Sequence, residues 1–369
     1  MGCALPDAGP TAAGAGAALA PARIDIVYLW VDGADPAWSE RRSRAYADWT
    51  ARHPRQLAVH GNVSGRYRDN GELRYNLRAL EKFFPEHGHV YIVTDRQAPA
   101  WLRPSERLTL VDHRDLIPAA AMPVFDSGHI ESYLHHIPGL AERFIYLNDD
   151  VFFGQPVDPA NWFGERLTVF AETATVPERD ALQEDGTALV NAAILSKHWL
   201  ARRYPHYRHE PRLYSHAPRP MLKSAMRELE ALAGELFEQV RSTVFRSWRV
   251  PPLLPDLVPR WMVQMGYARQ AILDPLHISS GAQGAELQLA ALQADFGRLL
   301  FFCINDTCDE AEAGDPRLLR VAATLQRLLP QASSFETADV GALAKPNNQG
   351  RRAPAKPAYF SALKSIGVK

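Results

Sequence analysis

The chain has 369 residues, of which 46% are hydrophobic and 22% charged, and its formal net charge is -1. This length predicts two domains or one large domain with insertions, and the composition is that of a globular protein. The near-neutral charge gives nucleic-acid binding no compositional support, so an anionic ligand must be recognised by a local cluster of residues.

The cysteines and the two ends of the chain indicate its compartment. Cys3, Cys303 and Cys308 fit no four-ligand zinc site, and free thiols in a reducing, cytoplasmic setting are favoured over a Cys303–Cys308 disulfide. No apolar run is long enough to cross a membrane. Residues 1–22 predict a disordered leader, and residues 336–369 predict a flexible basic tail. This tail is either solvated or an arm for peripheral association with the inner membrane face, and the oligomeric state stays open.

The first predicted strand is a run of β-branched and aromatic residues from 24 to 31. It ends in Asp32-Gly33-Ala34-Asp35, and Pro36 suits the first turn of a following helix. Asp32 and Asp35 could bind a metal at this strand end. They could equally well shape an Asp-Gly turn, and the local sequence favours the turn at least as much.

The next predicted helix begins near Asn70, with Asp69 or Asn70 as its N-cap, and ends at Pro85. Its apolar residues recur at helical spacing and form a buried stripe. Four arginines lie around the start of this helix, namely Arg66, Arg68, Arg74 and Arg78. Such a cluster suits the bidentate recognition of phosphate, and a solvated arginine face is the alternative.

Three further strands are predicted over residues 90–94, 108–111 and 144–147, and each is followed by polar residues. Strands alternate with helices over residues 24–150, which predicts a Rossmann-like, mostly parallel sheet whose carboxyl edge binds ligands. At that edge, Asn148-Asp149-Asp150 could hold a hard divalent cation, or could be turn or cap residues.

The second half of the chain has a less regular pattern. The predicted elements are a strand at 168–171, helices at 191–204, 220–240 and 257–268, a strand at 299–304 and a helix at 316–330. We therefore expect a Rossmann-like half over 24–172, a mainly helical insertion over 173–298, and a closing strand and helix over 299–335.

The residue types at these strand ends indicate a chemistry. The sequence has no nucleophile elbow, no P-loop and no dinucleotide fingerprint after a strand. Acids that can hold Mg²⁺ or Mn²⁺, together with arginines for phosphates, describe a site for a nucleotide diphosphate. The residues alone therefore indicate a metal-using transferase that takes a nucleotide sugar, on an α/β fold of the Rossmann-like, GT-A type.

Four segments, in order, resemble the conserved regions of the Stealth family. The matching segments are residues 24–36, 66–78 with 91–95 and 147–150, 215–218 with 243–247, and 303–306. The third departs from the family pattern, because Ala217 stands where methionine is expected after His216. Members of this family are sugar-1-phosphate transferases, and the resemblance covers about residues 24–310.

The resemblance implies a reaction. A hexose-1-phosphate would move from a nucleotide-diphosphate sugar, such as UDP-GlcNAc, to a hydroxyl of an acceptor glycan in capsular or cell-surface polysaccharide synthesis. A nucleoside monophosphate would be released. The alternatives are a metal-dependent GT-A glycosyltransferase that releases a nucleoside diphosphate, and a non-catalytic glycan-binding relative.

The resemblance also implies roles for individual residues. Asp149 and Asp150, with Asn305 and Asp306 as further candidates, would hold Mg²⁺ or Mn²⁺. His216 or Asp32 would accept the proton of the acceptor hydroxyl, since both lie in matched segments. Arg246 would contact the diphosphate as a catalytic residue. The remaining substrate-binding candidates are Asp35, Arg66, Asp69, Asn70, Arg74 and Arg78.

Overall fold

The computed structural model describes residues 23–337 and shows an α/β fold around a five-stranded sheet, in the order β3-β2-β1-β4-β8. Its strands are β1 (Ile24–Leu29), β2 (Val90–Thr94), β3 (Leu108–Asp112), β4 (Arg143–Asn148) and β8 (Arg219–Leu222). β1 pairs in parallel with β2 and β4, β2 pairs in parallel with β3, and β8 runs antiparallel to β4. The predicted Rossmann-like class with a mostly parallel sheet is confirmed.

The central strands are buried on both faces. Ile26, Val27 and Tyr28 of β1 and the Phe144–Leu147 stretch of β4 are fully buried. Parallel strands that are covered on both faces read as continuous apolar runs, which is why the sequence predicts them well. The strand order reverses between β1 and β4, and open α/β sheets bind ligands at such a reversal.

Two smaller sheets extend the fold. One has the order β10-β11-β5 and the other the order β7-β6-β9. Their strands are β5 (Val151–Phe153), β6 (Leu167–Thr175), β7 (Arg212–Tyr214), β9 (Ala268–Ile272), β10 (Leu276–Ser279) and β11 (Phe301–Asn305). The stretch 173–298 thus contributes strands to all three sheets, in addition to its helices.

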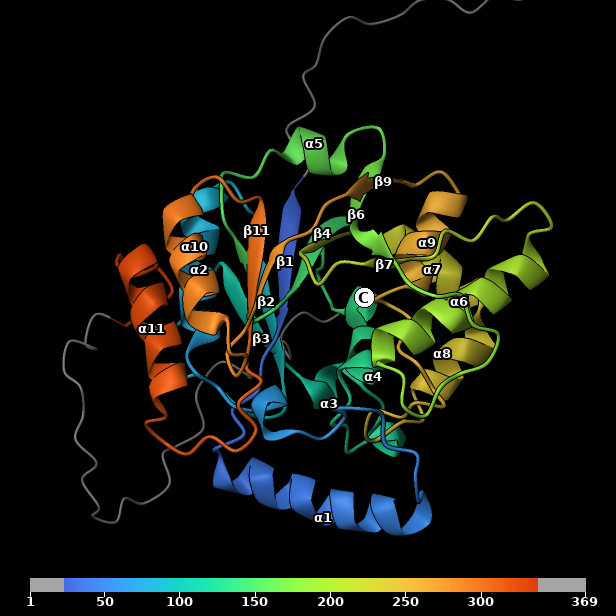
Figure 1. The fold of residues 1–369 in the computed structure, drawn as a ribbon, viewed down its shortest axis with the longest axis horizontal. Helices are drawn as coiled ribbons and strands as arrows, with labels where there is room; N and C mark the ends of the chain where they lie inside the picture. The colour runs from blue at the N-terminus through green and yellow to red at the C-terminus, as the bar shows by residue number, and fades with distance from the viewer. Residues whose placement is uncertain (1–22, 338–369) are drawn as a thin grey trace, which may run out of the picture.

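Helices cover both sides of the central sheet (Figure 1). On one side lie α2 (Glu72–Phe83), α10 (Ala285–Asp295) and α11 (Pro316–Leu328). On the other lie α6 (Ala188–Arg203), α7 (Lys223–Leu232), α8 (Gly234–Val240) and α9 (Leu257–Gln264). Shorter elements are α3 (His113–Leu116), α4 (Ser127–Glu131), α5 (Pro159–Phe163), and the 3₁₀ helices η1 (Ser64–Arg66), η2 (Ala119–Ala121) and η3 (Leu134–His136).

Helix α1 (Pro36–Arg52) crosses beneath the sheet in Figure 1 and has its own small core. Trp38 and Trp49 of this helix are buried against Tyr67, Phe125 and Phe245. The rings of Phe125 and Phe245 stack with their centroids 5.2 Å apart. This aromatic cluster fixes α1 next to the segments that carry Arg66 and Arg246.

The predicted helix over 220–240 is wrong at its start. Arg219–Leu222 forms edge strand β8 instead, with Met221 paired to Phe144 of β4. Pro220 tolerates this position because an edge strand has one side without ladder partners. The remaining residues form two helices, α7 and α8, which are separated at Ala233. Pairing with a distant strand overrode the local helical spacing.

The fold also continues past the predicted start of the tail. Phe335 is fully buried and Glu336 is 5% exposed, and Glu336 forms a bridge with Leu102. Residues 1–22 and 338–369, where the leader and most of the tail were predicted, lie outside the described residues. Among residues 23–337, no helix combines the length and the apolar character that crossing a membrane requires.

Candidate active site

A cavity of about 330 Å³ opens at the carboxyl edge of the central sheet. Residues that follow four parallel strands line it: Trp30 after β1, Asp95 after β2, His113 after β3, and Asp149 and Asp150 after β4. Since the strand order reverses between β1 and β4, the cavity occupies the ligand-binding position of an open α/β sheet. The cavity thus lies at the edge where the sequence predicts the site.

The turn between β4 and β5 carries the two acids, and Asn76 holds it. The Asn76 side-chain amide donates to the backbone oxygens of Asp149 (3.0 Å) and Val151 (2.6 Å). Its own oxygen accepts from the hydroxyl of Tyr28 at 2.9 Å. Asn76 and Tyr28 are fully buried. Sequence reasoning assigned Asn76 no role, although an amide on the buried face of a helix is a signal that could have found it.

Several carboxyl groups lie close together next to this turn. Burial raises the pKa of Asp149 well above its usual range, and the carboxylates of Glu72, Asp150 and Asp69 raise it further. Burial also raises the pKa of Glu72 to about 7, although Asn70 donates to both of its oxygens at 2.7 and 2.8 Å. A divalent cation with oxygen ligands would neutralise such a group of acids. The donor set therefore fits Mg²⁺ or Mn²⁺.

Asp150 lies between His216 and Cys303. The His216 Nε2 is 3.1 Å from one Asp150 oxygen, and the Cys303 thiol donates to the other at 3.4 Å. Burial opposes ionisation of Asp150, but the neighbouring His216 outweighs it and lowers the pKa of this carboxyl below its usual value. Burial, and then Asp150, raise the pKa of Cys303 far above its usual range, so the sulfur stays a protonated donor. The ligand atoms of these three residues all lie within 4.8 Å of one another.

A pair of arginines, Arg66 and Arg246, lines the same cavity. Arg246 donates to the Ser127 hydroxyl at 2.6 Å, and its Nε lies 3.6 Å from Asp126. Burial lowers the pKa of Arg66, and the neighbouring charge of Arg246 lowers it further. The Nε atoms of both arginines are buried without a hydrogen-bond acceptor within residues 23–337. A ligand with two negative charges would relieve this repulsion and accept these hydrogen bonds.

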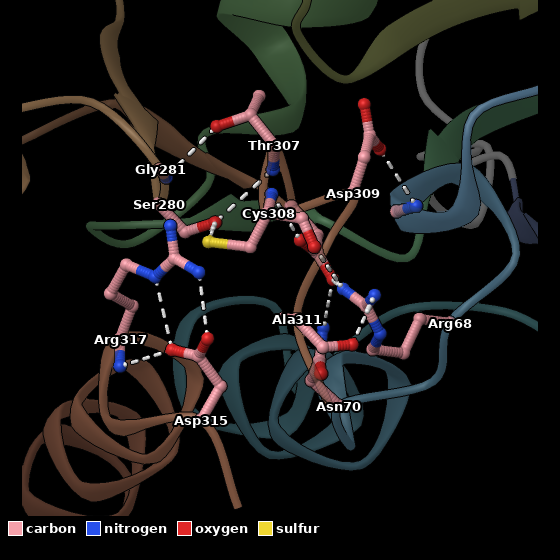
Figure 2. A network of polar contacts seen from close by, with 12 residues as sticks. Arg68, Asn70, Ser280, Gly281, Thr307, Cys308, Asp309, Ala311, Asp315 and Arg317 are labelled. Atoms are coloured by element: carbon pink, nitrogen blue, oxygen red, sulfur yellow. Dashed lines mark hydrogen bonds and ion pairs between the residues drawn. The ribbon is translucent and has the colours of Figure 1, made fainter. Parts of the chain in front are cut away.

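Asn305, the last residue of β11, and the following Asp306 also line the cavity, but Asp306 already has partners. One oxygen of its carboxylate accepts from Arg68 (2.5 Å) and Asn70 (3.0 Å), and the other accepts from the backbone of Cys308 (2.9 Å). Arg68 also donates to the backbone oxygens of Cys308 and Ala311 (Figure 2). Arg68, Asn70 and Asp306 therefore fix the loop after β11, which leaves Asp306 with less capacity for a metal than Asp149.

Six of the predicted site residues do not line the cavity, and four of them, Asp32, Asp35, Asp69 and Asn70, have structural partners close by in the chain or in the lining. Asp35 caps α1 by accepting from the backbone of Trp38, Asp32 accepts from the backbone of Ala34, and Asp69 accepts from that of Gly71. The fourth, Asn70, binds Glu72 and Asp306, which are both lining residues. For Asp32 and Asp35 the structure thus shows the turn and cap roles that the sequence left open.

Arg74 and Arg78 are not at the cavity, contrary to expectation. Both guanidinium groups bind the carboxylate of Glu336, and Arg78 does so through two hydrogen bonds of 2.7 Å. The Arg78 and Glu336 side chains are 4% and 1% exposed. The arginine cluster is therefore divided, because a carboxylate near the C-terminus holds two of its members in the core.

Glu131 of α4 lines the cavity and was not predicted as a site residue. One of its carboxylate oxygens accepts from the Tyr146 hydroxyl at 2.9 Å, whereas the other is buried without a partner in residues 23–337. Cys303 was likewise missed as a neighbour of Asp150, although the sequence places it two residues before Asn305. Neither role has a local sequence signal, since both depend on which strands become neighbours.

Comparison with known proteins identifies the family. Residues 22–46 match the model of Stealth protein conserved region 1, and residues 66–170 match that of conserved region 2. The capsular polysaccharide phosphotransferase WcwK of Streptococcus pneumoniae is 30% identical over 348 residues, which cover 85% of this chain and 99% of WcwK. The exopolysaccharide phosphotransferase SCO6023 of Streptomyces coelicolor is 35% identical over 322 residues.

The extent of these matches differs among the relatives. This chain spans about half the length of SCO6023 (52%) and a third of SCO2592 (33%), a second exopolysaccharide phosphotransferase of Streptomyces coelicolor. Among solved structures, the galactosyltransferase LgtC aligns with 84% of this chain and 98% of its own, at a TM-score of 0.38 and 10% sequence identity. On the evidence of the conserved regions and of WcwK, which the match covers almost completely, the chain belongs to the Stealth family.

Proposed function

We propose that this protein transfers a hexose-1-phosphate from a nucleotide-diphosphate sugar to a hydroxyl of an acceptor glycan. One observation carries the proposal: two acids, Asp149 and Asp150, line the same cavity as two arginines, Arg66 and Arg246, whose Nε atoms have no hydrogen-bond acceptor within residues 23–337. A diphosphate needs both kinds of group, since its charge is shared between a cation and guanidinium donors. The names of WcwK and SCO6023, both polysaccharide phosphotransferases, support the same reaction class.

The atoms balance in a single displacement. The acceptor oxygen forms a bond to the phosphorus that carries the sugar, and the bond from this phosphorus to the bridging oxygen of the diphosphate breaks. The nucleoside monophosphate leaves, and the sugar remains joined to the acceptor by a phosphodiester. Mg²⁺ or Mn²⁺ bound by Asp149 and Asp150 would screen the charge of the diphosphate.

The chain's own residues have distinct tasks in this reaction. Arg66 and Arg246 bind and orient the phosphates, and their charge stabilises the negative charge that develops in the transition state. We assign His216 as the base for the acceptor hydroxyl, because it lines the cavity and Asp150 fixes its ring. Asp32 is less suited to that task, because it lies outside the lining and its carboxylate accepts from the backbone of Ala34.

Identification of the released nucleotide tests the proposal. Purified protein is incubated with UDP-GlcNAc and a panel of other nucleotide sugars, with acceptor glycans and with Mg²⁺ or Mn²⁺. A sugar-1-phosphate transferase releases UMP from UDP-GlcNAc, and phosphorus-31 NMR of the product shows a phosphodiester. Release of UDP instead would identify a glycosyltransferase that attacks the sugar carbon. Absence of any turnover across the donor panel would favour a glycan-binding role.

A further inference from the structure

A second cluster of metal-ligating side chains lies outside the cavity. It consists of His135 and His136 of η3 and Glu230 of α7, whose ligand atoms all lie within 4.8 Å of one another. None of the three lines the candidate active site. The two histidines follow one another in the chain, and the carboxylate comes from a helix 94 residues further on. The fold, and not the local sequence, assembles this cluster.

The two imidazole rings aim at a single point. The Nε2 atoms of His135 and His136 lie 2.5 and 2.8 Å from the same carboxylate oxygen of Glu230, Oε2. The ring centroids are 4.2 Å apart. Two imidazole nitrogens and one carboxylate oxygen thus meet at hydrogen-bond distance, and an ion bound to all three would replace these hydrogen bonds.

The ring of His135 is buried and faces the other two side chains of the cluster. Its side chain is fully buried. The Nδ1 atom of His135 is buried without a hydrogen-bond partner in the described part of the chain. Among the described residues, the polar contact of this ring is therefore the one between its Nε2 and Glu230.

A second layer of contacts fixes the carboxylate. Arg241 pairs with Glu230 through the other carboxylate oxygen, Oε1. The same guanidinium donates to the hydroxyl and the backbone oxygen of Ser132 at 3.1 and 2.7 Å, and it lies over the Tyr133 ring at 4.0 Å. Oε2 is thereby held toward the histidines, which is how outer partners orient the ligands of a metal.

We propose that His135, His136 and Glu230 form a binding site for Zn²⁺ that is separate from the candidate active site. Two imidazole nitrogens and one carboxylate suit Zn²⁺ and are poor ligands for Mg²⁺ or Ca²⁺, which prefer oxygen ligands alone. The side chain of His136 is 42% exposed, which gives the ion a path from solvent and leaves a fourth position for water.

Such an ion would link η3 to α7. The helix that precedes η3 in the chain is α4, whose Ser127, Ile130 and Glu131 line the active-site cavity. Zn²⁺ would therefore stabilise the position of α4 without contacting the substrate. Its role would be structural. The ion should raise the melting temperature of the protein and should take no part in the transfer reaction.

The experiment measures Zn²⁺ binding by calorimetry on the full chain after treatment with a chelator. Asp150 and His216 could also bind Zn²⁺, so the reference protein carries Asp150→Asn and His216→Ala. We expect this protein to bind one Zn²⁺ per chain, to melt at a higher temperature when Zn²⁺ is present, and to show neither effect with Mg²⁺.

Two matched variants of this reference protein decide the site. His136→Ala removes a half-exposed ligand and should weaken Zn²⁺ binding by at least about tenfold, since even the loss of an outer partner costs about 10- to 100-fold. His206→Ala removes an exposed histidine elsewhere and should change nothing. Circular dichroism checks that both variants are folded.

The position of the ion gives an independent readout. In a crystal soaked with Zn²⁺, an anomalous peak is expected between the two imidazoles and Glu230 Oε2. Zn²⁺ affinity that is unchanged in both His136→Ala and Glu230→Gln would overturn the proposal. The proposal would also be overturned if crystals of the wild-type protein showed an anomalous peak at Asp150 and none between the two imidazoles.

Discussion

Two pairs of arginines in this molecule have opposite surroundings. Arg74 and Arg78 share the buried carboxylate of Glu336, whereas Arg66 and Arg246 lie side by side in the cavity with buried Nε atoms that have no acceptor within residues 23–337. Burial opposes ionisation of Glu336, but Arg78 and a backbone hydrogen bond from Ser333 outweigh it and lower its pKa to about 2. The first pair donates to a carboxylate within the protein, whereas the second pair keeps buried donors without an acceptor in residues 23–337. We infer that hydrogen bonding to a carboxylate separates the structural arginines from the binding arginines here.

The largest effect is expected on stability, at the pair Arg74 and Arg78, which binds Glu336. Glu336→Gln leaves the Arg78 charge buried without its counter-charge and should lower the free energy of unfolding by about 3–5 kcal/mol. Urea denaturation measures this loss. Transfer activity per folded molecule should be nearly unchanged. Glu310→Gln, which alters an exposed partner of Arg317, is the control and should leave the denaturation midpoint almost where it was.

The opposite outcome for Glu336→Gln would break the comparison. If the variant kept its urea midpoint and lost transfer activity, Arg74 and Arg78 would belong to the binding machinery after all.

The second-largest effect is expected on the transfer rate, at the pair Arg66 and Arg246, which lines the cavity. Arg246→Ala should lower the rate of sugar-phosphate transfer by about 10²–10³-fold, which is the usual loss when one preorganised donor to a developing charge is removed. The melting temperature should stay within a few degrees, because Asp126, 3.6 Å from the Arg246 Nε, keeps its hydrogen bonds from Thr243 and Gly128.

Arg249→Ala is the matched control, since Arg249 is exposed three residues further on and packs over Trp248. A large drop in melting temperature for Arg246→Ala, with transfer preserved, would make Arg246 a structural residue.

The same comparison can be made for a buried carboxyl group of the cavity, Glu72. Glu72 is 5% exposed, and its pKa of about 7 exceeds the ordinary 4.5. Because the folded state binds this proton more tightly than the unfolded state, the wild-type protein loses stability as the pH rises from 4.5 to about 7. Glu72→Gln lacks this loss, so above pH 7 it should be more stable than the wild type by about 1–3 kcal/mol.

Urea midpoints of chelator-treated protein between about pH 4.5 and pH 8 measure this difference. It should vanish toward the acid end of the range. Parallel pH profiles for the two proteins would show that the charge of Glu72 is already compensated in the fold.

The smallest effect on stability is expected at Asp35, whose carboxylate caps α1. Asp35→Ala removes the N-cap of α1 and should cost about 1 kcal/mol of stability, whereas Asp35→Asn keeps the cap and should cost less. Transfer by both variants should match the wild type within twofold or so, since Asp35 has its partner in the backbone of Trp38. A collapse of transfer in Asp35→Asn would return this residue to the substrate site.

Much of the fold follows from local sequence. The strands β1, β2 and β4 are continuous apolar runs because both faces are buried, and acids at their ends mark the carboxyl edge. Sequence periodicity could not predict β8, because pairing with β4 decides its conformation. The same limit holds for the arginines, since the partner of Arg78 lies 258 residues away. Residue type predicts a diphosphate site, but only tertiary contacts identify the two arginines, Arg74 and Arg78, that bind Glu336 instead of lining the cavity.

The amide of Asn76 has a consequence for ligand binding. Since this one side chain ties the Asp149–Val151 turn to helix α2 and, through Tyr28, to strand β1, the backbone of both acids is ordered before any ligand arrives. An incoming cation would then lose little affinity to the conformational entropy of its own binding loop. Asn76→Ala should therefore weaken cation binding even though the side chain of Asn76 never needs to touch the ion.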